Sequence, residues 1–340
     1  MCLYSTLMKN PKYGYSKKNR GNIPVLKDKR VGYIAGGCGR CMECLKQKGS
    51  GWRVRLMEDV KDYIGAKFVT LTFNEESLND LRNVVNKDRK LEGYDLDNEV
   101  VVLAVKRFRE RWRKKTKKSP RHWLVSELGD KNGRIHMHGI VYGSKEMIEE
   151  KWGYGFVDVK EHVNDVSISY ITKYITKVDV KHKGYRPKIC TSPGIGAGYI
   201  ERSKGKHTYV KGNTRTDYRL RNGVKVALPR YWKEKLWTED EREEMWIEML
   251  DKDERWIGGE KIQKKYDRED EQETELRKYW QERNERLGYG KREKKWDEIG
   301  YRNDKQRMNK KKERNEKLDK GKYSEFVEDM VSGFNDGVFE

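Results

Sequence analysis

The sequence predicts a protein of the α+β class, with a central domain of strands and helices between two segments of different composition. Three observations lead to this prediction: strand-like and helix-like patterns alternate in the middle of the chain, cysteines gather before it, and charge is dense after it. We therefore divide the chain into a Cys-rich segment at 1–60, a mixed domain at 61–235, and a charged, mainly helical or partly disordered region at 236–340.

The strands of the middle domain are predicted from short apolar runs. FVTLTF at 68–73 is β-branched and aromatic, as expected of a buried strand. RHWLVSEL at 121–128 and RIHMHGIVYG at 134–143 flank the turn-like segment GDKNG, so they predict two strands joined by a turn. Further on, the Asn-Gly step at 222–223 suits a turn with positive φ, which predicts a hairpin between TDYRL and VKVAL.

Two helices are predicted in the same domain. Residues 98–115 carry apolar side chains at helical spacing on one face, and 166–177 has a similar pattern. The other face of the first helix is basic, with ten Lys or Arg and one acidic residue between 106 and 121. A basic amphipathic helix of this kind could lie on a membrane, but we expect its basic face to follow a DNA backbone.

The composition predicts nucleic acid as the partner. The chain has a net charge of +20, from 76 Lys and Arg against 56 Asp and Glu, and only 35% of its residues are apolar while 39% are charged. Clustered cations favour binding to phosphate because they release its counterions. Between 261 and 320, 36 of 60 residues are charged, which indicates a solvated helix or arm rather than a catalytic core.

The sequence gives no indication of a membrane partner. It contains no apolar run near the roughly 18 residues needed to cross a bilayer, and its first residues, MCLYSTLMKN, lack the apolar core of a signal peptide. We therefore expect the protein to work in the cytoplasm of the cell that makes it.

A metal site is predicted from His136, His138 and Glu127. The two histidines alternate along a strand, so both imidazoles lie on one face of it. Glu127 lies on the preceding strand, and a hairpin of matching register brings it beside His136. Two histidines and a carboxylate suit Mg²⁺ or Mn²⁺ acting on phosphate, although non-haem iron(II) uses a similar triad.

A tyrosine helix supplies the candidate nucleophiles. Tyr170, Tyr174 and Lys177 are spaced i, i+4 and i+7, and therefore lie on one helix face. Lys173 and Lys177 place cations within one turn of the phenols, and a cation favours the phenolate that attacks. The alternative is a half-buried aromatic stripe that only packs the helix on the sheet.

The cysteines form a separate candidate site. Cys38, Cys41 and Cys44 follow one another at three-residue spacing, and Cys2 supplies a fourth thiolate for a structural Zn²⁺. Unligated reduced thiols are the alternative, and part of the spacing also resembles an iron–sulfur pattern. The fifth cysteine, Cys190, is predicted to be a small buried apolar residue.

In this order, FVTLTF, HMH and YITKYITK resemble the motifs of HUH rolling-circle replication initiators: an apolar strand with threonine, a His-hydrophobic-His strand and a two-tyrosine helix. The chain looks most like the replication-initiation proteins of gokushovirus-type microviruses, small single-stranded DNA phages of the Microviridae. Further similar segments are MCLYSTLMKNPKY, CGRCMEC, RHWLVSELG, TSPGIGAGYI and LPRYW. The resemblance covers about residues 1–260, and only the combination of motifs is specific.

The resemblance implies an HUH endonuclease fold, with a central antiparallel sheet flanked by helices. It implies that Glu127 completes the metal site, because a carboxylate on the strand before the HUH strand commonly does so in these enzymes. The implied activity is metal-dependent nicking of single-stranded DNA at an origin, through a 5′-phosphotyrosine link and a free 3′-OH, followed by strand transfer and ligation. The two tyrosines would alternate in successive rounds.

The implied partners are single-stranded or nicked origin DNA, host DNA polymerase and a host helicase, since the sequence contains no Walker loop. The implied location is the cytoplasm of the bacterial host. Two alternatives remain: a sequence-specific nucleic-acid-binding protein without catalysis, and an HUH relaxase or transposase. The tyrosines follow the HUH motif in the chain, which favours the replication or transposase branch over relaxases.

Overall fold

The computed structural model describes residues 1–289, apart from the gaps 17–18, 88, 130–132, 179–181, 183–184, 253 and 264–268, and apart from the side chains of 269 and 270. Residues Met1–Gly290 form one compact unit. The predicted charged tail beyond 289 lies outside the described residues. Within the described part, no helix is both long and apolar enough to cross a bilayer.

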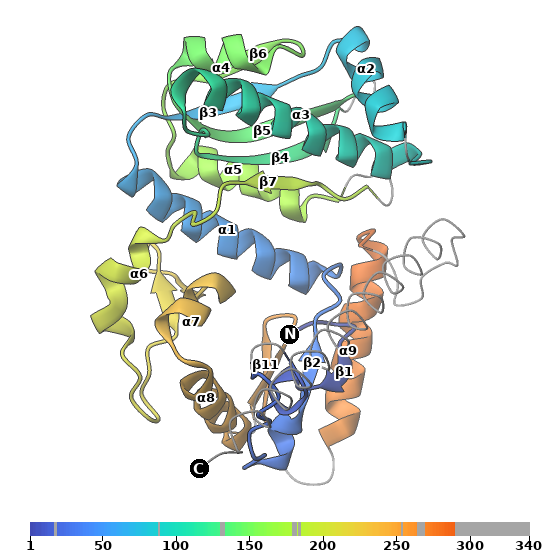
Figure 1. Ribbon diagram of the computed structural model, residues 1–340. Helices are drawn as coiled ribbons and strands as arrows, with labels where there is room; N and C mark the ends of the chain where they lie inside the picture. Colours follow the sequence, from blue (N-terminus) through green and yellow to red (C-terminus); the bar gives the residue numbers. More distant parts are fainter. Residues whose placement is uncertain are drawn as a thin grey trace, which may run out of the picture. The chain divides into compact units, whose positions relative to one another are not determined.

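A five-stranded antiparallel sheet forms the centre of the fold (Figure 1). Its strands are β3 (Ala66–Leu71), β4 (His122–Leu128), β5 (Ile135–Tyr142), β6 (Val157–Lys160) and β7 (Ile189–Thr191). They are ordered β6-β3-β5-β4-β7, and every neighbouring pair is antiparallel. The predicted strands at 68–73, 121–128 and 134–143 are confirmed as β3, β4 and β5, so the sheet is antiparallel as the resemblance implies.

Three helices cover one face of this sheet: α2 (Glu75–Asn86), α3 (Gly93–Thr116) and α4 (Lys145–Trp152). The core between them and the sheet contains Leu71, Met137 and Phe108, all fully buried. The helix predicted at 98–115 is confirmed as α3, which begins one turn earlier. This layer leaves the opposite face of β3, β4 and β5 for the functional side chains, since alternate strand residues point to opposite faces.

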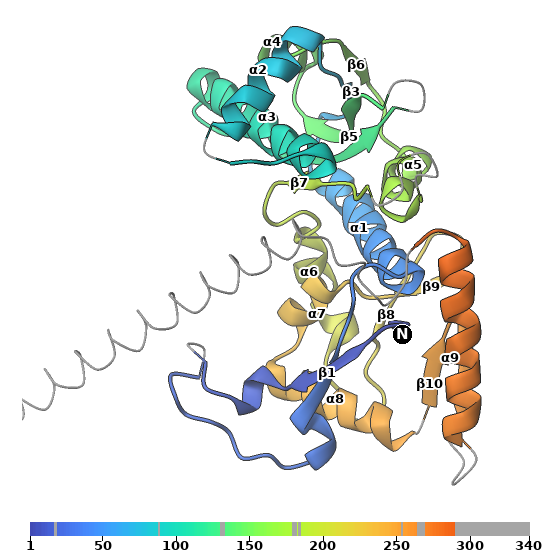
Figure 2. The same ribbon diagram turned by 90° about the vertical axis from the view of Figure 1, so that its right-hand side faces the viewer.

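Helices α1 (Met42–Asp62) and α5 (Asp165–Thr176) lie against that opposite face and against each other (Figure 2). Ile171 and Ile175 of α5 pack in one apolar cluster with Val125 and Ile140 of the sheet. Gly49 allows the two helices to approach closely, because a Cβ added there would lie 3.1 Å from the Cγ2 of Thr176. The helix predicted at 166–177 is thus confirmed, while α1 as a single long helix was not predicted.

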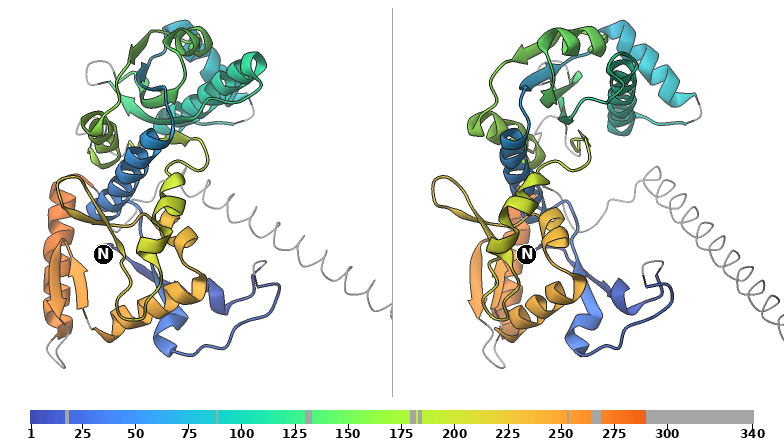
Figure 3. Two further views of the ribbon diagram at one scale, coloured as in Figure 1. Left: turned by 90° about the vertical axis from the view of Figure 1, so that its left-hand side faces the viewer. Right: turned by 60° about the vertical axis from the view of Figure 1, so that its left-hand side comes forward.

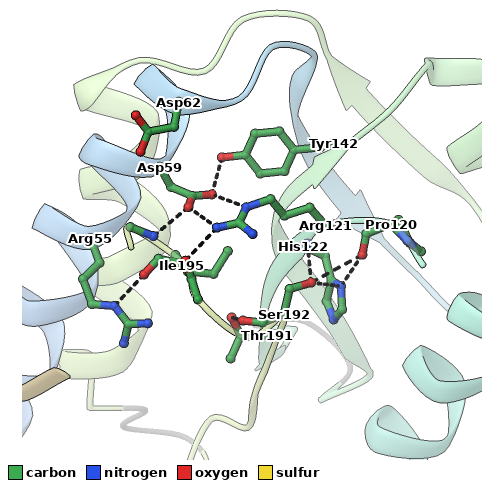
Figure 4. Close-up of polar contacts among 12 residues, drawn as sticks. Arg55, Asp59, Asp62, Pro120, Arg121, His122, Tyr142, Thr191, Ser192 and Ile195 are labelled. Atoms are coloured by element: carbon green, nitrogen blue, oxygen red, sulfur yellow. Dashed lines mark hydrogen bonds and ion pairs between the residues drawn. The ribbon is translucent and has the colours of Figure 1, made fainter. Parts of the chain in front are cut away.

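A buried carboxylate fixes the end of α1 to the sheet (Figure 4). Asp59 is fully buried and pairs with the guanidinium of Arg121 at the start of β4. It also accepts hydrogen bonds from the Tyr142 hydroxyl (2.7 Å) and the Gly196 amide (2.6 Å). Because a buried charge is stable only when it is paired and hydrogen-bonded, this network holds α1, the sheet and the loop around 194–196 in one arrangement.

The chain after β7 forms small elements against α1. These are α6 (Gly198–Ser203), the 3₁₀ helix η3 (Lys204–His207), β8 (Asp217–Arg219), β9 (Lys225–Ala227), α7 (Arg230–Leu236) and α8 (Glu239–Asp251). Strands β8 and β9 pair as the predicted hairpin, with Gly223 in the turn at φ +82°. The hairpin packs through Tyr218 and Leu228 into the cluster that contains α1 and α5.

The two ends of the described chain meet near the cysteines (Figure 3). The N-terminal elements are β1 (Thr6–Lys9), η1 (Pro11–Tyr13), η2 (Lys29–Gly32) and β2 (Tyr33–Gly36), and the C-terminal ones are β10 (Glu254–Ile257), β11 (Glu260–Gln263) and α9 (Glu269–Arg286). Leu3, Met42, Ile257 and Trp280 form a small apolar core there. The charged segment therefore contributes packed structure as far as α9.

Candidate metal centres and nucleophile helix

The three predicted ligands of the first metal site come together on the α5 face of the sheet. Residue pairing in the β4–β5 hairpin places Glu127 directly opposite His136, which is the register that the sequence required. A carboxylate oxygen of Glu127 lies 3.5 Å from Nε2 of His136 and 3.2 Å from Nε2 of His138, and the two Nε2 atoms are 3.1 Å apart. These three residues thus offer one oxygen and two nitrogens to a single point, as a cation site requires.

The opposite ring nitrogens of both histidines are held by neighbours. Nδ1 of His136 lies 3.2 Å from the carbonyl oxygen of Arg134, and Nδ1 of His138 lies 3.1 Å from Oγ1 of Thr70. A proton on Nδ1 that is donated to an oxygen leaves the Nε2 lone pair free for a metal. Thr70 is opposite His138 in the β3–β5 register and was not predicted as a site residue. Its signal was a hydroxyl in an otherwise apolar strand.

Glu127 is held in its ionised form. Burial by itself would raise its pKa, but hydrogen bonds with His136 and His138 and the ammonium of Lys177 at 2.8 Å lower the pKa well below its ordinary value. The structure thus places Lys177 on the carboxylate ligand, whereas the sequence placed it beside the phenols. Its ammonium is also 5.7 Å from the ring centroid of Tyr174.

The two predicted nucleophiles face this site from α5. The ring of Tyr174 stacks on His138, with centroids 5.0 Å apart and planes 7° from parallel. The Tyr174 hydroxyl donates a hydrogen bond of 2.5 Å to the Tyr170 hydroxyl. Tyr174 is buried, while Tyr170 is 51% exposed and therefore accessible to a large substrate. Burial and the bond to Tyr170 raise the pKa of Tyr174 above its ordinary value.

Lys173 lies elsewhere. The sequence grouped it with Lys177 as a cation beside the phenols, but the structure places it among the residues that line a hollow between α5 and α1. The side chain is exposed, and α5 turns it away from Glu127. A four-residue spacing between lysines cannot show this difference, because α5 ends at Thr176 and Lys177 already leaves the helix with extended backbone.

The four predicted cysteine ligands also come together. The Sγ atoms of Cys38 and Cys44 are 4.0 Å apart, as are those of Cys41 and Cys2, and one ligand atom from each of the four lies within 4.8 Å of the others. A tetrahedron with Zn–S bonds of about 2.3 Å has edges of about 3.8 Å, so the spacing fits. The amides of Cys38 and Cys41 donate to thiol sulfurs of Cys2 and Cys38, at 3.2 and 3.3 Å. Cys190 lies apart on β7 and packs, partly buried, against the core under α3.

Helix α9 covers the cysteine centre. Its fully buried Asn284 accepts a hydrogen bond from the amide of Met42 (2.8 Å) and donates to the hydroxyl of Tyr4 (3.3 Å). After α9, the Tyr289 hydroxyl donates to the carbonyl of Thr176 at the end of α5 (2.9 Å). The charged sequence of α9 gave no indication of this role, since its contacts come from isolated residues in a polar helix.

Comparison with known proteins gives two matches. Residues 66–179 match a family model of replication-associated proteins, described under the name ORF2. The chain is 26% identical over 237 residues to "Replication-associated protein ORF4" of Chlamydia phage 1, which covers 60% of this chain and 54% of that protein. The chain thus aligns with about half the length of this curated relative. No solved structure matches the chain. The two matches confirm the resemblance to microvirus replication proteins.

Proposed function

We propose that this chain, with its match to replication-associated proteins at 66–179, initiates rolling-circle replication of a small single-stranded DNA phage genome. In this proposal it is an HUH-type nickase that cuts origin DNA through a tyrosine. One observation carries it: the Tyr174 ring stacks against His138, a ligand of the candidate metal site, and its hydroxyl is paired with that of Tyr170. Family membership alone does not identify a nucleophile, whereas this geometry does.

The residues at the site fit a catalytic divalent cation. Glu127, His136 and His138 would hold it, and three protein ligands leave positions open for substrate oxygens. When bound, Mg²⁺ or Mn²⁺ would polarise the scissile phosphate and offset the negative charge that develops on it. Thr70 and the Arg134 carbonyl orient the two imidazoles, and Lys177 holds Glu127 as a carboxylate.

Tyr170 is proposed as the first nucleophile, because its ring is exposed and its oxygen accepts the hydrogen bond from Tyr174. A hydrogen bond donated to the attacking oxygen favours its phenolate form. The phenolic oxygen bonds to phosphorus while the bond from phosphorus to the 3′ oxygen breaks, and the phenol proton ends on the released 3′ oxygen. The products are a 5′-phosphotyrosine and a 3′-OH that a host polymerase extends.

Tyr174 would serve the second cleavage. After one round of synthesis the origin is regenerated, and a second phenol can attack it while the released 3′-OH attacks the first phosphotyrosine. Each step exchanges one phosphoester for another, so no external energy source is required. Strand separation is assigned to a host helicase, which with the polymerase and the bacterial cytoplasm completes the proposed setting.

The cysteine centre is proposed to hold a structural Zn²⁺. Four thiols with Sγ–Sγ spacing near a tetrahedral edge, amide donors on the sulfurs and a covering helix are features of closed structural sites. The centre offers no open position to a substrate. It would fix the N-terminus and α9 to the start of α1.

The experiment uses fluorescent single-stranded oligonucleotides tiled across the genome that encodes the chain, incubated with the protein and Mn²⁺. Denaturing gels are expected to show a covalent protein–DNA band that disappears with EDTA and in a Tyr170→Phe/Tyr174→Phe double variant. Tyr170→Phe alone should lower the initial rate by about 100-fold, and Tyr174→Phe less, since direct loss of a nucleophile costs more than loss of its hydrogen-bond donor. DNA binding without a covalent band in any oligonucleotide would favour a non-catalytic binding protein.

A further inference from the structure

A second hollow lies on the other side of the nucleophile helix, between α5, α1 and the β8–β9 hairpin. Its volume is about 260 Å³, close to the lower end of small-molecule sites at about 300 Å³. The residues that line it are Lys46, Gly49, Ser50, Arg53, Val54, Ser169, Thr172, Lys173, Thr176, Leu220 and Val226. None of these is acidic and none is aromatic.

The hollow has an excess of positive charge. Lys46, Arg53 and Lys173 line it, and within the described part of the chain only Lys46 has an acidic partner, Glu43, at 3.5 Å. The Nε atom of Arg53 is buried and has no hydrogen-bond partner among the described residues. A buried guanidinium donor without an acceptor costs free energy, so the geometry calls for an acceptor that comes from outside the chain.

The hydroxyl groups of the hollow do not change its charge preference. Ser169, Thr172 and Thr176 each donate to a backbone carbonyl of α5, as helix hydroxyls often do. The donors that remain for a ligand are Arg53, Lys173 and Ser50. Two of these three are cations, which indicates an anionic ligand that accepts hydrogen bonds.

The hollow is connected to the tyrosine face by Lys173. At about 100° per residue, Lys173 lies about 60° around the helix from Tyr170 and about 60° from Thr176, on the groove side. A flexible polyanion that leaves the Tyr170 hydroxyl and wraps around α5 therefore meets the ammonium of Lys173 first and Arg53 next. A small free anion would use Arg53 but would not need this path.

We propose that this hollow binds the phosphodiester backbone of the single-stranded DNA adjacent to the scissile phosphate. The inference rests on the proposed function and names a second contact for the same substrate. The absence of aromatic side chains in the lining indicates recognition of phosphate rather than stacking on a base. The site would bind the flanking strand regardless of its sequence and would hold it while the tyrosine reacts.

The test measures DNA affinity without cleavage, in full-length protein that carries Tyr170→Phe/Tyr174→Phe. Oligo-dT strands from about 4 to about 16 nucleotides are titrated by fluorescence anisotropy at several salt concentrations. Arg53→Gln is expected to weaken binding of the longest strand about five-fold, with a salt slope lower by about one, and to leave the shortest strand unchanged. Arg53→Lys should recover most of the affinity.

The matched control is Lys145→Gln, which removes one charge from α4 on the opposite face of the sheet. Lys173→Gln serves as the second variant, with thermal melts to show that each variant is folded. Equal affinities for Arg53→Gln and Lys145→Gln, or an equal loss for short and long strands, would overturn the proposal. Competition by inorganic phosphate at millimolar concentration, with no dependence on strand length, would instead assign a free-anion site and also overturn it. Because binding is measured without cleavage, failure of the nicking test leaves this result separate.

Discussion

The two candidate metal centres of this chain differ in what surrounds their ligands. Glu127, His136 and His138 stand on a sheet with two tyrosine hydroxyls in front of them, one of them on an exposed side chain. The four cysteines are covered by α9 and the β10–β11 hairpin, in an apolar cluster that includes Leu3 and Trp280. The first centre is open toward a substrate and the second is closed.

This difference separates chemistry from folding within one chain. An open site with hard oxygen and nitrogen ligands exchanges a metal and admits phosphate, whereas a closed thiolate site holds its metal as part of the fold. Loss of metal should therefore abolish activity at the first centre and structure at the second. The predictions below test this division, and the largest effect is expected at the cysteines.

Cys41→Ser should lower the free energy of unfolding by on the order of 5 kcal/mol, because structural zinc binding is itself folding free energy. Bound zinc, measured by mass spectrometry or a chromogenic chelator, should fall in parallel. Hydrogen exchange should show lost protection in β10, β11 and α9, while the central sheet stays protected. Cys190→Ser, outside the cluster, is the matched control and should change stability by about 1 kcal/mol at most. Unchanged zinc content and unchanged protection in Cys41→Ser would exclude a structural metal.

The cysteine centre also shows what the sequence could predict. The ligands Cys2, Cys38, Cys41 and Cys44 followed from their number and spacing alone. The cover did not, because Asn284 and Trp280 are single residues in a helix whose other side chains are mostly charged. A helix that is held by a few buried residues has no continuous apolar stripe, so its periodicity does not reveal which face is packed.

Glu127→Gln should weaken Mn²⁺ affinity at the open centre by about 100-fold or more, since it removes the only charge among the three ligands. Nicking should fall at low Mn²⁺ and recover in part at high Mn²⁺, while zinc content and melting temperature stay near those of the parent. Calorimetric titration with Mn²⁺ provides the measurement, and the exposed Glu149→Gln on α4 is the charge-matched control. A variant with parental Mn²⁺ affinity would show that the carboxylate is not a ligand.

The open centre was predicted more completely than the closed one. Strand alternation placed His136 and His138 on one face, and the short separation of β4 and β5 in the chain favoured the register that brings Glu127 opposite His136. Lys173 and Lys177 could not be separated, because their difference depends on where α5 ends and on the position of α1. Thr70 was missed for a similar reason, since its role depends on pairing between strands that are distant in sequence.

The smallest effect concerns acid, which acts on the two regions by different routes. His122 of β4 is almost fully buried, with Nδ1 3.0 Å from both the Pro120 carbonyl and Oγ of Ser192, and burial lowers its pKa to about 4. The unfolded chain binds this proton with a pKa of about 6.5, so the stability from neutral His122 is complete above pH 6.5 and is lost as pH falls toward 4. About 2 kcal/mol should be lost between pH 8 and pH 5.

Urea unfolding followed by tryptophan fluorescence at pH 8 and pH 5 measures this loss, with zinc content determined in the same samples because acid also protonates thiolates. His122→Asn is expected to be less stable at pH 8 but to lose about 2 kcal/mol less on acidification, since it has no titrating ring. His162→Asn, at an exposed position, should keep the parental pH dependence. If His122→Asn also keeps it while zinc is released between pH 8 and 5, acid destabilisation comes from the cysteine centre and not from the sheet.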